Sequence, residues 1–273
     1  MAYKSESIVA ADGTRLAVYR WLATKPVGHI VLAHGLGEHA GRYDEIASYF
    51  AQQLWSVHAL DHRGHGRSAG VRGHVGRWTD YARDLQQLTS SLPQDGLKRM
   101  LLGHSMGGMI AVTHLLEYPG TFVRAALSAP ATDVSIAVPP VKAAIGNLLS
   151  NLWPTLTLAT PLEAKDVCSR ASVAQAYAQD PLVHNKVSTR WFTEYFAMIE
   201  RVKREAGSLR TPIAIWHGEA DVLVAPRVSE EFYGRLQVEP RQRTVLPKLF
   251  HEVMFEASWQ STADAILDWF RAA

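Results

Sequence analysis

Short apolar runs rich in branched side chains alternate along the chain with longer segments whose apolar positions recur at helical spacing. The first kind of segment predicts buried strands, and the second predicts helices that pack through one face. Strands are expected at 16–21, 29–34, 56–60, 99–104, 123–129, 213–218 and 243–246, and helices near 43–54, 78–91, 106–118, 226–236 and 256–271. This alternation is typical of an α/β fold, a mostly parallel sheet with helices on both faces.

The alternation stops between Pro130 and Leu209, where the sequence shows no convincing strand. An insertion into the sheet domain explains this gap. The predicted organisation is a core from 1–130, a helical cap from 131–209 and the rest of the core from 210–273.

One stretch of the insertion, "VKAAIGNLLSNLW", predicts a short amphipathic lid helix. The residues on its apolar face are Val141, Ile145, Leu148, Leu149 and Leu152. This face would either rest on a membrane or micelle surface or pack against the core domain. The pattern leaves both alternatives open.

Composition narrows the functional classes. With 273 residues and 47% hydrophobic content, the chain can bury a large core. Its 28 basic and 26 acidic side chains give a net charge of +2, too weak and scattered for nucleic acid to be the main partner. The single cysteine, Cys168, excludes an internal disulfide and a cysteine-rich zinc site. The N-terminus lacks the pattern of a secretory signal, and no apolar run is long enough to span a membrane, so we expect a cytoplasmic protein.

The segment "GHSMG" carries the clearest chemistry. Gly103, Ser105 and Gly107 form G-x-S-x-G directly after an expected strand and directly before an expected helix. A serine at such a sharp turn is held in a strained conformation and presented above the edge of the sheet. The neighbouring positions are glycines because residues with side chains there would collide with the serine. We therefore expect Ser105 to be a nucleophile rather than an incidental residue of a glycine-rich turn.

A serine hydroxyl needs a base and an orienting carboxylate. His251 is the only histidine after residue 220 and lies between the last expected strand and helix. Asp221 follows a strand end, where side chains face the ligand crevice of an α/β sheet. Glu219 and Asp180 are rival acids. We expect His251 as the base and Asp221 as the acid.

The oxyanion formed on attack needs two backbone donors. The N–H of Met106, the residue after the nucleophile, is the first. The second is the N–H of Leu36, because the apolar run "HIVLA" ends in His34 and Gly35 and leaves the next amide free to point into the site.

Other polar residues are expected to be structural. His58, His62 and His65 lie close together but without a zinc-binding pattern, and neither a metal nor another cofactor is expected. The arginines and glycines of 61–77 would suit either a phosphate patch or a tightly turned loop braced by polar side chains. We favour the braced loop. Cys168 is expected to be a packed thiol, not a nucleophile.

Taken together, "HGLGEHAGRY", "LDHRGHGRSAG", "GHSMGG", "HGEAD" and the late His251 resemble the monoacylglycerol lipase and lysophospholipase branch of the α/β-hydrolases across essentially the whole chain. The resemblance implies an eight-stranded sheet with a helical cap after the sixth strand. It also implies a triad of Ser105, Asp221 and His251, with an oxyanion hole at Leu36 and Met106. The implied substrates are esters of one fatty acyl chain, chiefly monoacylglycerols.

The expected reaction is a two-step acyl transfer through an acyl-enzyme. The same residues would also suit three other functions: a general carboxylesterase, a lysophospholipase, and a ligand-binding protein that retains the triad. Dehalogenase and epoxide hydrolase functions are disfavoured because those relatives have aspartate where this chain has Ser105.

Overall fold

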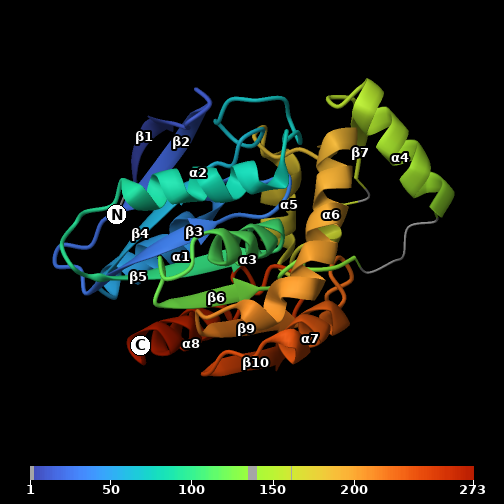
Figure 1. Ribbon diagram of the computed structural model, residues 1–273. Helices are drawn as coiled ribbons and strands as arrows, with labels where there is room; N and C mark the ends of the chain where they lie inside the picture. Colours follow the sequence, from blue (N-terminus) through green and yellow to red (C-terminus); the bar gives the residue numbers. More distant parts are fainter. Residues whose placement is uncertain (1–2, 135–139, 161) are drawn as a thin grey trace.

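The computed structural model describes residues 3–134, 140–160 and 162–273, and the strands of its main sheet form its centre (Figure 1). These are β1 Lys4–Val9, β2 Arg15–Trp21, β3 Gly28–Ala33, β4 Trp55–Leu60, β5 Lys98–His104, β6 Arg124–Ser128, β9 Ile213–Gly218 and β10 Arg241–Leu246. They are ordered β1-β2-β4-β3-β5-β6-β9-β10. The six strands β4, β3, β5, β6, β9 and β10 run parallel to one another. At one edge, β1 pairs antiparallel with β2, and β2 pairs antiparallel with β4. The predicted α/β class with a mostly parallel, eight-stranded sheet is confirmed.

Helices cover both faces of this sheet. They are α1 Asp44–Gln52, α2 Trp78–Ser90, α3 Met106–Glu117, α7 Pro226–Arg235 and α8 Trp259–Arg271. Strand side chains alternate between the two faces. Leu101 packs with the apolar residues of α2, α3 and α7, whereas its neighbours Met100 and Leu102 pack with those of α1 and α8. The sheet is thereby fixed between two buried layers.

The segment between β6 and β9 has its own elements. They are α4 Pro140–Leu152, β7 Thr157–Ala159, α5 Ala171–Gln179, β8 Lys186–Ser188 and α6 Thr189–Glu205. The two short strands pair with each other and not with the main sheet. The expectation of no strand between Pro130 and Leu209 was therefore wrong. Three-residue strands leave too short a pattern of alternation to be seen in a sequence.

The expected lid helix corresponds to α4, which lies beside α6 and away from the main sheet (Figure 1). Its contact with α6 uses Gly146, next to the ring of Phe192, and Ser150, whose hydroxyl is 2.9 Å from that of Thr193. On the predicted apolar face, Ile145, Leu148 and Leu152 are more than half exposed, at 52%, 59% and 60%. Those three side chains are not packed against the core. The side chain of Val141 lies outside the described residues.

The sequence pattern missed β1. Residues Lys4–Val9 form an edge strand that is exposed along most of its length, so polar side chains replace the apolar run expected of a buried strand. Within the described part of the chain, no helix combines the length and apolarity that crossing a membrane requires.

Candidate active site

The predicted site residues lie at the carboxyl ends of four parallel strands. The loop with Gly35 and Leu36 follows β3, Ser105 follows β5, and Asp221 and His251 follow β9 and β10. In open α/β sheets, ligands bind at this edge. The fold thus brings residues from four distant parts of the chain to one edge of the sheet.

Ser105 stands at the turn from β5 into α3. Its φ of 52° lies in the left-handed region that side chains rarely adopt, and its N–H donates to Ser128 O at 2.9 Å. A Cβ at Gly107 would overlap the carbonyl oxygens of Ala33 and His34, and one at Gly103 would lie 2.6 Å from Gly107 O. The glycines of G-x-S-x-G are therefore required by the close approach of β3, β5 and α3.

Asp221 and His251 are bonded to each other. His251 Nδ1 lies 2.6 Å from Asp221 Oδ2, and both residues are 5% exposed. The other carboxylate oxygen, Oδ1, accepts the backbone N–H groups of Leu223 and Val224, each at 2.9 Å. These bonds fix the carboxylate, which in turn fixes the orientation of the imidazole ring.

The same contacts set the charges of the pair. Burial alone would lower the pKa of His251, but the charge of Asp221 and the hydrogen bond to it outweigh burial and raise that pKa. Burial would raise the pKa of Asp221, yet attraction from His251 and hydrogen bonds from His217 and His251 hold it well below its usual range. The arrangement favours an ionised carboxylate beside an imidazole of enhanced basicity.

The rival acids lie elsewhere. Glu219 is exposed and accepts the N–H of Lys248 at 3.1 Å, whereas Asp180 pairs with His39 Nε2 at 2.8 Å. Of the three acids considered from the sequence, the structure brings only Asp221 to His251.

The two backbone segments that carry the expected oxyanion donors both lie next to Ser105. Met106 is the first residue of α3, and the first N–H groups of a helix have no carbonyl partner within that helix. A Cβ placed on Gly35 would lie 3.4 Å from Ser105 Cβ, so the loop that carries Leu36 runs against the serine. Two backbone segments therefore border the space around the hydroxyl.

Two further histidines in the site were not anticipated. His217 Nε2 lies 3.1 Å from Asp221 Oδ2 and 2.8 Å from Val224 O, so Asp221 Oδ2 contacts two histidines. The ring of His104 lies 4.8 Å from that of His251, centroid to centroid, and burial lowers the pKa of His104 to about 3. The position of His217, four residues before Asp221, was the only signal in the sequence for the first of these contacts.

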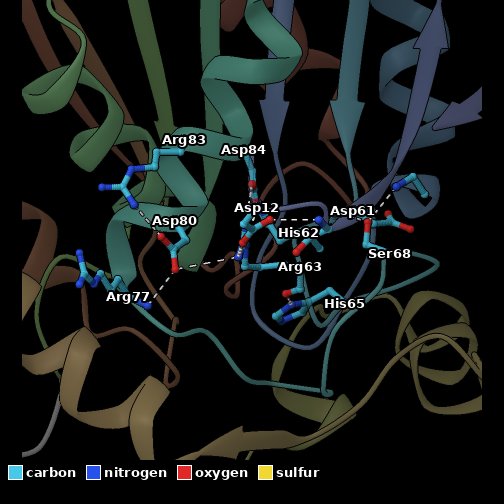
Figure 2. Close-up of polar contacts among 12 residues, drawn as sticks. Asp12, Asp61, His62, Arg63, His65, Ser68, Arg77, Asp80, Arg83 and Asp84 are labelled. Atoms are coloured by element: carbon cyan, nitrogen blue, oxygen red, sulfur yellow. Dashed lines mark hydrogen bonds and ion pairs between the residues drawn. The ribbon is translucent and has the colours of Figure 1, made fainter. Parts of the chain in front are cut away.

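The loop after β4 is braced by polar side chains. Figure 2 shows Arg63 between Asp12, Asp80 and Asp84, and its two bonds to Asp84 are both 2.7 Å long. Because Arg63 already has carboxylate partners, the braced-loop interpretation is confirmed for this residue over a phosphate patch.

The expected histidine cluster is divided. His58 bonds to His29 at 3.0 Å, while His62 and His65 are buried next to His34 (Figure 2 shows the loop that carries them). Across the described residues, no three or more His, Cys, Asp or Glu side chains form a group that could hold a metal ion.

Comparison with known proteins agrees with this architecture. The family model described as serine aminopeptidase, S33, matches residues 24–258. A monoacylglycerol lipase of Mycolicibacterium smegmatis is 34% identical over 96% of this chain and 95% of its own length. Human monoglyceride lipase is 34% identical over 79% of this chain and 73% of its own length. The solved monoacylglycerol lipase of Paleococcus ferrophilus has a TM-score of 0.84 and 29% identity, covering 92% of this chain and 97% of its own.

The fold, the order of its strands and the site at the carboxyl ends of the parallel strands together define an α/β-hydrolase. The chain belongs to the serine aminopeptidase S33 family of hydrolases, in the branch that includes the monoacylglycerol lipases, and it is a carboxylic ester hydrolase.

Proposed function

We propose that the protein hydrolyses monoacylglycerols to glycerol and free fatty acid, with Ser105 as nucleophile, His251 as general base and Asp221 as the orienting acid. The observation that carries the chemical part is the strained Ser105 at the end of β5, together with the 2.6 Å bond between Asp221 and His251, which follow β9 and β10 at the same edge of the sheet. The substrate class is supported by the lipase named above, which matches this chain along nearly its whole length.

The proposed reaction has two steps. His251 takes the proton of Ser105 as the hydroxyl oxygen attacks the ester carbonyl, and the N–H groups of Leu36 and Met106 stabilise the oxyanion. The ester C–O bond then breaks, His251 gives its proton to the leaving glycerol oxygen, and an acyl-enzyme remains. His251 then takes a proton from water as the water oxygen attacks the acyl carbon, the bond from that carbon to Ser105 Oγ breaks, His251 returns the proton to Oγ, and the fatty acid leaves.

Residues 131–209 act, in this proposal, as a cap over the acyl chain. The exposed side chains of α4, with the 62% exposed Trp153 at its end, form an apolar surface that suits transient contact with a membrane or micelle. The helix α4 lies beside α6 and away from the main sheet (Figure 1), and these side chains are exposed, which favours lipid contact over the alternative of packing against the core. A cytoplasmic location stays a prediction from the sequence.

The decisive experiment compares wild type and Ser105→Ala on monoacylglycerols of increasing chain length, on the matching di- and triacylglycerols, on a lysophospholipid and on short soluble esters. We expect hydrolysis of monoacylglycerols by wild type and a loss of about 10⁴-fold or more in Ser105→Ala.

Other outcomes would redirect the proposal. Cleavage of short soluble esters alone would leave the triad in place and indicate a general carboxylesterase, and preference for the lysophospholipid would move the substrate class. Full activity in correctly folded Ser105→Ala would refute the mechanism. Tight ligand binding without turnover would indicate a binding protein.

A further inference from the structure

A buried ion-pair network joins two loops of the site that are far apart in the sequence. Glu38 lies in the loop after β3, Arg42 follows it by four residues in the 3₁₀ helix Ala40–Tyr43, and Glu252 comes directly after His251. All three side chains are nearly inaccessible, with exposures of 2%, 8% and 3%. Burying three charged groups is costly unless their partners are well placed, so their geometry indicates a specific role.

The network has continuous hydrogen bonds from one loop to the other. Glu38 Oε1 accepts the N–H of Gly35 at 2.6 Å, and Glu38 Oε2 bonds to Arg42. Arg42 then holds Glu252 with two bonds, of 2.6 and 2.8 Å. Because Gly35 immediately precedes the expected oxyanion donor Leu36, the chain of contacts runs from that loop to the residue next to His251.

Aromatic residues complete the enclosure of Arg42. Its guanidinium carbon lies 4.6 Å from the ring centre of Tyr177, in α5, and 4.8 Å from that of Phe255. The hydroxyl of Tyr43 donates to Glu38 Oε1 at 2.7 Å. These contacts restrict the orientation of the guanidinium, and a forked donor such as arginine can bond to both carboxylates at once.

We propose that Glu38, Arg42 and Glu252 act as positioning residues that fix the distance between the oxyanion donor at Leu36 and the base His251. This inference rests on the proposed function of those two groups. Attack by Ser105 requires the base and the donor to be placed correctly at the same moment, and an error of about 1 Å in such placement costs about 100-fold in rate. The formal charges of the three side chains leave one negative charge near the imidazolium that forms during attack.

The test is the rate at which a fluorophosphonate labels the serine, because this reaction uses nucleophile, base and oxyanion donors but not a lipid substrate. Glu252→Gln keeps the side-chain shape but loses the charge and one of the two acceptors. Arg42→Lys keeps the charge but cannot span both carboxylates. We expect both variants to lower the maximal labelling rate by about 100-fold, with the probe concentration for half-maximal rate changed by less than about threefold.

The matched control is Asp84→Asn, which removes the charge from another buried carboxylate with two bonds to one arginine, Arg63. It should lower the melting temperature as much as Glu252→Gln while labelling at the wild-type rate. Should Arg42→Lys fail to fold, the isosteric Glu252→Gln decides the question.

The outcomes separate the two proposals. Wild-type labelling rates in the variants, or an equal loss in Asp84→Asn, overturn the positioning role alone. Labelling of Ser105→Ala at the wild-type rate overturns the proposed mechanism, and the positioning role with it. Absence of monoacylglycerol hydrolysis alongside the expected labelling pattern overturns only the substrate class.

Discussion

The surroundings of Asp221 and those of α4 differ in how firmly each is held by the rest of the protein. Both oxygens of Asp221 accept hydrogen bonds, and its partner His251 is buried. In α4, apolar side chains such as Leu148 and Leu152 face outward, and the helix is held mainly along one side by α6. Reaction chemistry requires fixed groups, whereas contact with lipid requires an accessible apolar surface.

The largest effect is expected from loosening the fixed region. Asp221→Asn removes the charge and leaves an amide that can hold the wrong tautomer of His251, so kcat should fall by about 10⁴-fold. Ester hydrolysis with a soluble substrate measures this effect, and Glu219→Gln, on the same turn but exposed, is the control. An equal loss in both variants would contradict the assignment of Asp221.

A second prediction concerns pH. His251 must be unprotonated to act as a base, and although burial alone would lower its pKa, Asp221 raises it above the ordinary value of about 6.5. We therefore expect kcat/KM to fall about tenfold per pH unit below a midpoint higher than 6.5, and to be constant above it. His104 and Asp221, which lie next to His251, do not titrate near this midpoint. The pKa of His104 is about 3, and that of Asp221 is well below its usual value.

The pH profile of a soluble ester between pH 5 and 9 gives this midpoint, with tryptophan fluorescence as a check on folding. A midpoint below 6 in folded protein would show that Asp221 does not act on His251 as described.

The exposed region should respond differently. The double variant Leu148→Glu/Leu152→Glu places charges on the apolar surface of α4, so activity on monoacylglycerol in vesicles or micelles should fall by about tenfold through weaker binding. Hydrolysis of a short soluble ester should be unchanged. A matched control is Asn147→Glu/Asn151→Glu, which adds the same charges at exposed polar positions of the same helix. Equal losses on both substrates would mean that α4 acts on the reaction itself.

The smallest effect is expected from thiol reagents. Cys168 is 2% exposed, and burial raises the pKa of its thiol to about 12, so little reactive thiolate forms near neutral pH. Treatment with iodoacetamide should change ester hydrolysis by less than about twofold, even when it lasts long enough to alkylate a small thiol compound completely under the same conditions. Rapid inactivation, absent in Cys168→Ala, would contradict this expectation.

The firmly held core around Asp221 was also the part of the molecule that the sequence predicted best. Strands such as β3 and β5 were predicted because full burial on both faces produces continuous apolar runs. Ser105 was found through its glycines, and Asp221 and His251 through their places after strand ends. Their pairing is observed in the structure, while their catalytic roles remain proposals.

Contacts between distant segments could not be predicted in this way. Arg42 and Glu252 are far apart in the chain, and each alone has the appearance of an ordinary surface charge. Nor did periodicity indicate whether the apolar side of α4 would be covered, because it identifies a face but not what lies against it.

The segment proposed as the cap is joined to the core unevenly. The backbone N–H of His184 donates to Gly37 O, and that of Ser188 donates to Gly73 O, both at 2.8 Å. Gly37 and Gly73 have positive φ values and approach the backbone of His184 and Lys186 so closely that a Cβ would overlap it. Residues 184–188 are thus built into the core, but α4 is not. Changes in α4 should therefore be tolerated by the fold and, under the proposed function, alter the lipid surface that the protein contacts, whereas the segment near Gly37 and Gly73 should tolerate little change.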